Sequence, residues 1–361
     1  MRNTYLRVGQ HLLARIIIQN PSDNFIRAYN NYYNWIKKNT RETENDFTCL
    51  IHDEMCEKTV DCHLISKKAN LSPIADEKKM VRTLGVNHTC PANEELKPTA
   101  IKAATTFRGF CGYHDSTIFK PLESGQIDQY NQEQIFLLCL RAAASQRCKT
   151  RKNVREGRFL QHSFHAKEVK ELLCELLSRD RLIDQVYNRK NFGKLGLFFQ
   201  VVKCVIGYRH KVRDFVAIAE AEYAAFDQLI CTFINQWKRK DLPRMRFCQF
   251  KVETQKIAFS TAIRFRCGAK DRFFFLFVLP NKEHSDILVA CLESDYKQLI
   301  KHNQPLLSCF EGDIKTIEKI ISIHNDSIVF SGKDFDGYEY MKYVYESNDP
   351  IADLFIPNLL H

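Results

Sequence analysis

Two short-spaced pairs of potential metal ligands are the chemically most distinctive residues of this sequence. Cys49 and Cys56 are separated by six residues, and Cys111 and His114 by two. Zinc prefers four tetrahedral nitrogen and sulfur ligands, and two such pairs supply that set when the fold brings them together. We therefore predict a structural zinc site built from these four residues.

Other metal-binding side chains in the same stretch leave the ligand set open. They are Cys62, Cys90, His52 and His88. The alternative to a zinc site is that the thiols are buried as small apolar groups, as is usual for free cysteines in a reducing compartment.

A candidate catalytic pair lies close to the predicted ligands. His63 stands in a run that predicts a strand over residues 60–65, and a neutral histidine can take a proton from water and so activate it against a phosphodiester. Asp115, directly after His114, offers a carboxylate to a divalent ion, with Asp61 as the other option. The alternative for His63 is structural: packing beside the zinc, or a hydrogen bond to a backbone carbonyl.

The order of motifs between residues 49 and 145 resembles a group of bacterial proteins. The chain reads C-L-I-H-D-E-M-C, then D-C-H-L-I-S-K-K-A-N-L, then F-R-G-F-C-G-Y-H-D-S-T-I-F-K-P-L-E, then N-Q-E-Q-I-F-L-L-C-L-R-A. These proteins are similar in layout to HNH-type (ββα-metal) nucleases with a treble-clef zinc module, and similar domains occur in bacterial anti-phage systems. The resemblance implies that His63 is the general base, that Asp115 binds a catalytic Mg²⁺ or Mn²⁺, and that the structural Zn²⁺ is held by Cys49, Cys56, Cys111 and His114.

The sequence departs from the nuclease pattern at three points. Cys62 precedes His63 where Asp or His is usual, the last metal ligand is Asp115 where His is usual, and the middle Asn has only Asn87 and Asn93 as candidates. Two hypotheses therefore stand. The first is a metal-dependent nuclease of DNA or RNA, and the second is a non-enzymatic zinc-structured module that binds nucleic acid or protein.

Composition and charge agree with either hypothesis. The 361 residues carry 53 Lys and Arg against 43 Asp and Glu, a net charge of +10 that suggests an anionic partner such as nucleic acid. We expect a cytoplasmic protein without membrane contact, because the chain shows no secretion signal and no apolar run of membrane-spanning length. A protein partner from a defence system is a further expectation, and the oligomeric state is left open. P-loop, esterase and Rossmann motifs do not occur in the sequence.

The expected fold class is α+β. We predict an N-terminal helical segment (1–45), an HNH-like treble-clef zinc module (46–126), a central helical region (127–243) and a C-terminal α+β domain with an antiparallel sheet (244–361). Helical patterns cover 23–38, 71–80, 135–144, 166–177, 192–212, 214–237, 296–302 and 312–323. Strand patterns cover 247–252, 256–265, 272–280 and 286–292.

Three further features have competing interpretations. The basic run 149–158 either neutralises phosphates or is a solvated helix end. The aromatic run 273–275 either stacks on bases or is a buried strand. The cysteines in apolar helical contexts are predicted to lie in the core, namely Cys139, Cys174, Cys204 and Cys231.

Overall fold

The computed structural model describes residues 23–41, 48–86, 94–123, 127–128, 131–163, 165–172, 194–324 and 327–333. Contacts between residues group the chain into two compact units. The first contains residues 1–42, 85–95 and 150–221, and the second contains residues 43–84, 96–149 and 222–361. The predicted division into four segments stays a prediction. Among the described helices, none has the length and apolar character needed to cross a membrane.

The first unit is helical. It contains α2 (Asp23–Asn39), which confirms the helix predicted there, the end of α5 (Gln132–His162) and the start of α8 (Lys194–Arg239). The Trp35 and Phe159 rings lie 4.7 Å apart. Beside them Ile36, Leu160 and Val216 pack in one buried cluster, so the apolar faces of the three helices form a small core.

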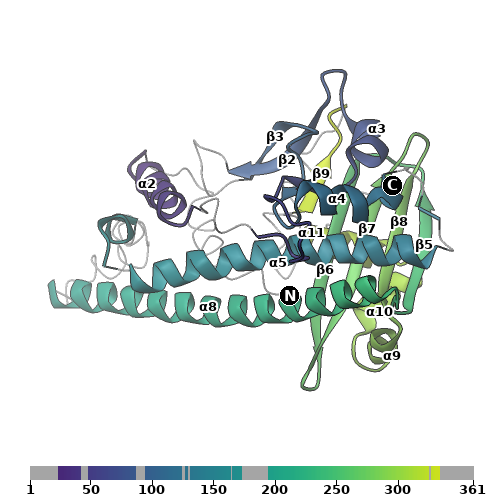
Figure 1. Cartoon of the computed structure of the whole chain (residues 1–361). Helices are drawn as coiled ribbons and strands as arrows, with labels where there is room; N and C mark the ends of the chain where they lie inside the picture. The colour runs from purple at the N-terminus through teal and green to yellow at the C-terminus, as the bar shows by residue number, and fades with distance from the viewer. Residues whose placement is uncertain are drawn as a thin grey trace. The chain divides into compact units, whose positions relative to one another are not determined.

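The main element of the second unit is a seven-stranded sheet (Figure 1). The strand order is β3-β2-β9-β6-β7-β8-β5, and the registered pairs are antiparallel, which confirms an α+β fold with an antiparallel sheet. The strands are β2 (Met80–Val86), β3 (Glu94–Ala100), β5 (Met245–Val252), β6 (Ile257–Cys267), β7 (Lys270–Pro280), β8 (Ser285–Leu292) and β9 (Ile328–Phe330). The sheet thus combines residues before position 101 with residues after position 244.

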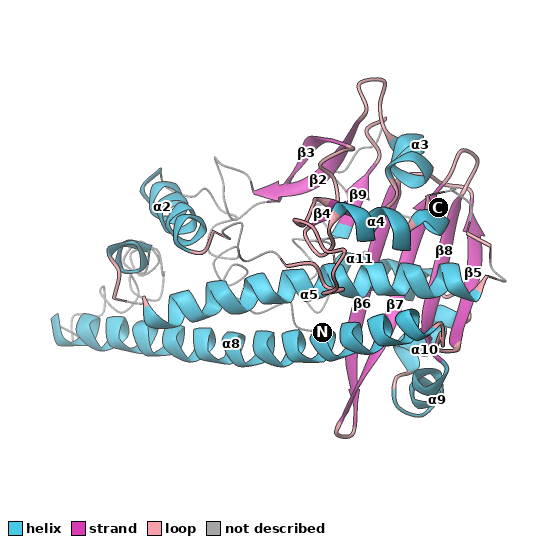
Figure 2. Ribbon diagram, viewed as in Figure 1, coloured by secondary structure: helices cyan, strands magenta, loops and turns pink. Residues whose placement is uncertain are grey.

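Both faces of this sheet are covered by helices (Figure 2). Alternate residues of β7 point to opposite faces, as in any strand. Phe275 lies in the core with α5 and α8, its ring 6.4 Å from Phe233, whereas Phe274 lies 5.9 Å from Phe310 on the other face. The helices on that second face are α9 (Glu293–His302), α10 (Gln304–Phe310) and α11 (Ile314–Ile323). The run 273–275 is therefore a buried strand, and its rings are not available for base stacking.

The helix predicted over residues 71–80 is wrong for most of its length. A π-helical turn (Lys67–Leu71) leads into the short α3 (Ser72–Ile74), and β2 begins at Met80. Asp76 Oδ1 accepts hydrogen bonds from the backbone N–H groups of Lys78 (2.9 Å) and Met80 (2.8 Å). Such local side-chain bonds satisfy the backbone in a turn and so compete with a helix.

Two other helix predictions are wrong in extent. The segments 192–212 and 214–237 form one helix, α8, because the apolar period continues through Val212 and Val216. The helix predicted over 135–144 begins at Gln132 and extends as α5 to His162, so it takes in the basic run, where Arg158 pairs with Glu220 at 2.8 Å. The run is thus at least partly engaged in ion pairs within the fold.

The cysteine predictions have mixed outcomes. Cys139 is fully buried, as predicted. Cys231 is exposed, so its core assignment is wrong: it lies on the outer side of α8, next to the buried Ile230. The side chains of Cys174 and Cys204 fall outside the described residues.

We expect Gly332→Ala to lower the stability of the second unit strongly. A Cβ at position 332 would lie 2.1 Å from the Met80 carbonyl oxygen, and backbone atoms cannot move aside as a flexible side chain can. Overpacking of this kind costs roughly 1–3 kcal/mol or more, which urea unfolding would measure. Gly268→Ala is the control: no atom lies within 4 Å of its Cβ, so only the strain of its positive φ remains. Equal losses in both variants would contradict the expected clash.

Candidate metal centre and the adjoining polar cluster

Short elements of the second unit position the predicted ligands. β1 (Cys62–His63) pairs antiparallel with β4 (Thr106–Phe107), and α4 (Gly112–Ile118) follows directly. The loop that carries the first two cysteines is bound to the second ligand segment through Leu50 N–H to the Gly109 carbonyl (2.9 Å) and Val60 N–H to the Phe110 carbonyl (3.0 Å). Backbone pairing thus brings two segments that are distant in sequence side by side.

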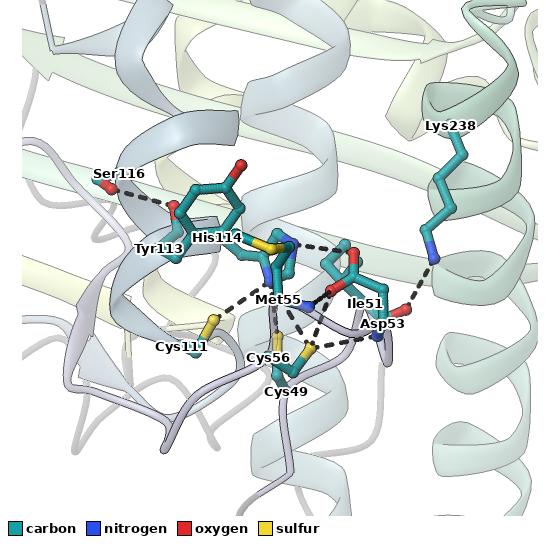
Figure 3. A network of polar contacts seen from close by, with 10 residues as sticks. All are labelled: Cys49, Ile51, Asp53, Met55, Cys56, Cys111, Tyr113, His114, Ser116 and Lys238. Atoms are coloured by element: carbon teal, nitrogen blue, oxygen red, sulfur yellow. Dashed lines mark hydrogen bonds and ion pairs between the residues drawn. The ribbon is translucent and has the colours of Figure 1, made fainter.

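The four predicted zinc ligands converge at this junction (Figure 3). The ligand atoms of Cys49, Cys56, Cys111 and His114, called the metal cluster below, all lie within 4.8 Å of one another. The three sulfurs are 3.5, 3.7 and 3.2 Å from His114 Nδ1, in that order. Three thiols and one imidazole around a shared centre could hold a metal ion and are compatible with a structural zinc site.

Asp53 fixes the orientation of the histidine in the metal cluster. Its Oδ2 lies 3.1 Å from His114 Nε2, while its Oδ1 accepts a hydrogen bond from the Met55 N–H at 3.0 Å. A carboxylate on the outer ring nitrogen leaves Nδ1 facing the sulfurs in the form that binds a metal. Lys238, near the end of α8, donates to the Ile51 carbonyl at 2.9 Å and steadies the same loop.

The thiols of the metal cluster differ in their surroundings. Burial raises the pKa of Cys49 to about 12, with the nearby Cys56 and Cys111 thiols contributing. Burial also acts to raise the pKa of Cys111, but backbone hydrogen bonds from residues that include His114 and Glu57 outweigh it, so the net shift is downward. The Cys111 sulfur therefore sits where the fold stabilises a thiolate, which is the form that binds metal.

We expect Asp53→Asn to weaken zinc binding by roughly 10–100-fold without abolishing it, which is the usual effect of losing a carboxylate behind a ligating histidine. Asn keeps the shape of Asp but lacks its charge. Competition with a chromogenic chelator would measure the affinity. The adjacent Glu54→Gln serves as the control, because Glu54 is exposed and is not one of the four residues of the metal cluster. Equal affinities of Asp53→Asn and the unchanged chain would contradict the role of Asp53.

The alternative ligands are not part of the metal cluster. The Cys62 thiol donates to the carbonyls of Val60 and Phe110, each at 3.5 Å, and burial with the nearby Asp115 charge raises its pKa to about 12. His52 is exposed and outside the cluster, whereas Cys90 and His88 fall outside the described residues. The Asn87 and Asn93 candidates also fall there.

The structure places the two predicted catalytic residues on adjacent elements. His63 lies on β1, opposite Thr106, and Asp115 lies on α4; both side chains are partly exposed. Asp61, the alternative carboxylate, instead pairs with Arg108 at 2.8 Å. His63 Nδ1 and Asp115 Oδ1 are both buried atoms with no hydrogen-bond partner in the described part of the chain.

Arg141 connects the surroundings of these two residues. It is only 3% exposed, its Nη2 donates to Glu123 Oε1 at 3.0 Å, and its guanidinium carbon lies 4.4 Å from the centre of the Phe119 ring. Glu123 Oε2 in turn accepts a hydrogen bond from Ser66 Oγ at 2.9 Å. Lys67 and Glu123 are exposed, so the group reaches solvent. We call this group the His63 cluster; it consists of His63, Ser66, Lys67, Asp115, Glu123 and Arg141.

The same charges act on His63 and Asp115. Burial lowers the pKa of His63, and the positive charges of Lys67 and Arg141 lower it further. The Ala104 carbonyl and Glu123 act in the opposite direction but do not reverse the shift. Burial raises the pKa of Asp115, although Arg141, Cys62 and Lys67 each act to lower it. His63 is therefore neutral at neutral pH, the form that accepts a proton.

Sequence reasoning missed the charged partners of His63, although it contained signals for them. Arg141 is the single charged residue between Glu133 and Arg147, in a helical run that is apolar from Ile135 to Ala144 apart from this arginine. Charged residues are rarely buried unless they are paired, so such a residue marks a specific contact. Glu123 ends the F-K-P-L-E motif, and Ser66 with Lys67 belongs to the I-S-K-K motif.

Comparisons with protein-family models, with curated proteins and with solved structures found no match to this chain. The resemblance to HNH-type proteins therefore stays a prediction based on the quoted motifs.

Proposed function

We propose that this chain is an HNH-like, metal-dependent nuclease that hydrolyses phosphodiester bonds of DNA or RNA. One feature supports the proposal above all: the charges of Lys67, Arg141 and Glu123 shift the pKa of both His63 and Asp115, which indicates that the two side chains lie near the same charged groups. A neutral base, a carboxylate and two cations at one partly exposed place are the groups that phosphodiester hydrolysis requires.

The layout of the module supports a treble-clef, ββα-metal assignment. The first cysteine pair precedes β1, and β4 pairs with β1 before α4 begins at the second ligand pair. In this proposal the metal cluster holds a structural Zn²⁺ that fixes α4 against the strands. The zinc has no part in the chemistry, because protein side chains occupy all four tetrahedral positions.

Each member of the His63 cluster has a role in the proposed reaction. His63 takes the proton of the attacking water as its oxygen bonds to phosphorus, and the bond to the leaving sugar oxygen breaks. The exposed Lys67 offsets the negative charge of the phosphate, and the buried Arg141, paired with Glu123, adds its positive charge from the interior. Asp115 Oδ1, which has no hydrogen-bond partner among the described residues, suits a hard cation, since Mg²⁺ and Mn²⁺ prefer oxygen ligands. Bound there, such an ion would stabilise the charge that develops on the phosphate.

A second candidate is a non-enzymatic module that binds a protein. Three of the large apolar side chains exposed among the described residues, Met55, Val60 and Tyr113, lie within a few residues of the metal cluster ligands. Exposed apolar groups of this kind are common at protein-binding surfaces. In this case the chain would bind its partner without cleaving nucleic acid. A place in bacterial anti-phage defence is proposed from the motif resemblance alone.

The test is cleavage of supercoiled plasmid and of structured RNA by the purified 361-residue chain. Reactions contain Mg²⁺, Mn²⁺ or no divalent ion, and His63→Ala is run alongside. Products that need both the ion and His63 support the nuclease. The proposal is overturned if His63→Ala cleaves as fast as the unchanged chain. It is also overturned if neither plasmid nor RNA is cleaved in the presence of Mg²⁺ or Mn²⁺.

A further inference from the structure

A pocket of about 260 Å³ lies beside β1, β4 and β9 in the second unit, and no member of the metal cluster or the His63 cluster lines it. Its wall carries six hydroxyl side chains and one lysine, and no carboxylate. Thr99 and Thr106 already donate to backbone carbonyls, and Thr83 is hydrogen-bonded to Thr99. The groups that can donate to a ligand are therefore the hydroxyls of Thr105, Ser145 and Ser327 and the Lys149 ammonium, whereas a carboxylate would repel an anion. The lining therefore suits an oxyanion.

The pocket extends from the surface into the core. Ala103 and Thr106 at its rim are exposed, whereas Ala104, Ser145 and Val329 are at most 2% exposed. A ligand would thus be partly removed from water, which strengthens its contacts with charged and polar groups.

Lys149 supplies the positive charge of this pocket. It lies on α5, is partly buried, and its Nζ donates to Ser327 Oγ at 2.5 Å. The bond holds the ammonium at the junction of α5 and the start of β9. Leu64, Leu84 and Ile328 add an apolar wall that can contact the organic part of a ligand.

Thr105 gives independent support for a ligand. Its Oγ1 is buried and has no hydrogen-bond partner among the described residues. Its φ is +58°, a conformation that is costly for a β-branched residue. Strained backbone of this kind occurs often at ligand sites, where the surroundings hold it in place.

We propose that this pocket binds the phosphate monoester of a nucleotide. Lys149 neutralises the phosphate, the hydroxyls of Thr105, Ser145 and Ser327 donate to its oxygens, and the apolar wall contacts the sugar or base. The volume is near the lower end of the range for small-molecule sites, which suits one nucleotide unit. That unit is either a free nucleoside monophosphate or the 5′-phosphorylated end of a strand. Binding does not depend on the proposed nuclease activity.

Calorimetric titration of the 361-residue chain without added Mg²⁺ or Mn²⁺ tests the proposal. The probes are AMP, adenosine, and a trinucleotide with either a 5′-phosphate or a 5′-hydroxyl. We expect both phosphorylated probes to bind more tightly than their unphosphorylated counterparts. The tighter of the two identifies the free nucleotide or the strand end as the ligand. Binding of no probe at millimolar concentration, or equal binding with and without phosphate, overturns the proposal.

Two variants locate the site. Lys149→Gln should weaken phosphate binding roughly tenfold or more, because a hydrogen bond to a charged group is lost. Lys152→Gln, three residues further along α5, should leave it unchanged. Unchanged binding in Lys149→Gln overturns the assignment.

Thr105→Gly tests the proposed site independently, and so remains informative if Lys149→Gln does not fold. It removes the hydroxyl and also relieves the positive φ, so the unfolding temperature should stay the same or rise while binding weakens. A purely structural Thr105 would behave in the opposite way. A lower unfolding temperature with unchanged binding would overturn the proposal.

Discussion

Replacing Cys111 with serine should abolish the zinc binding that we propose for the metal cluster and should destabilise the segment between residues 49 and 118. Serine is nearly isosteric with cysteine but does not provide a thiolate, so the metal cluster loses one of its four ligands. Cys111 also directly precedes α4, and its backbone forms an isolated β-bridge with Thr59. Loss of the metal would therefore weaken the contact between the two ligand segments.

The size of this effect depends on what holds the segment in the absence of metal. Structural zinc contributes roughly 10 kcal/mol or more to the folding of small zinc-finger peptides. Phe110 and Phe119 are fully buried here, with rings 5.1 Å apart, so some packing survives without the ion. We therefore expect a loss of several kcal/mol that is smaller than in isolated fingers.

Elemental mass spectrometry and urea unfolding measure the two consequences of Cys111→Ser. The control is Cys231→Ser, since Cys231 is exposed on α8 and does not belong to the metal cluster. The control should keep one zinc ion per chain and the original unfolding midpoint. One zinc ion per chain in Cys111→Ser would show that the ligand assignment is wrong.

The position of the metal cluster was predictable from sequence because zinc restricts its ligands to a few residue types. Spacing and residue type favoured Cys49, Cys56, Cys111 and His114, which the structure brings together, while the neighbouring cysteines and histidines stayed open as alternatives. Asp53 was not predicted. A carboxylate that contacts only the outer nitrogen of a ligand has no required spacing, so no motif marks it.

The ion pair near His63 could not be predicted from the sequence, for a different reason. The run around Arg141 indicated a buried helix, which the structure confirms. The partner of Arg141, Glu123, is 18 residues away and follows a separate helical turn. Ion pairs between elements depend on how the elements pack, and sequence periodicity does not contain that information.

The strands β2 and β3 were missed for a related reason. β3 contains Glu94, Lys97 and Pro98, which have low intrinsic preference for strands. It lies at the edge of the sheet, where proline and charged residues are tolerated, and β2 next to it pairs with the distant β9. Tertiary pairing, not local propensity, makes these segments strands.

His63→Ala should reduce the proposed nuclease activity by roughly 100–10,000-fold, the usual contribution of a positioned general base. This corresponds to about 3–5 kcal/mol in the activation free energy. Zinc content and unfolding should change little, because His63 is not in the metal cluster. His302→Ala, which removes an exposed histidine at the end of α9, should retain full activity. A His63→Ala variant that cleaves at the original rate would exclude His63 from the mechanism.

The pH dependence separates a catalytic from a structural His63. In the proposed mechanism the neutral form of His63 is the active base, and burial together with Lys67 and Arg141 lowers the pKa of His63 below its ordinary value of 6.5. Activity should therefore persist below pH 6.5 and fall only as the pH drops through this lowered pKa. Lys67→Gln removes one positive charge, so the pKa of His63 rises and the acid limb of the rate profile moves to higher pH. Lys68→Gln, which changes the adjacent exposed lysine, should leave the limb in place. The pH at which the limb falls does not depend on the maximal rate, so weaker substrate binding in Lys67→Gln cannot imitate this shift. An acid limb that does not move in Lys67→Gln would show that a group other than His63 titrates.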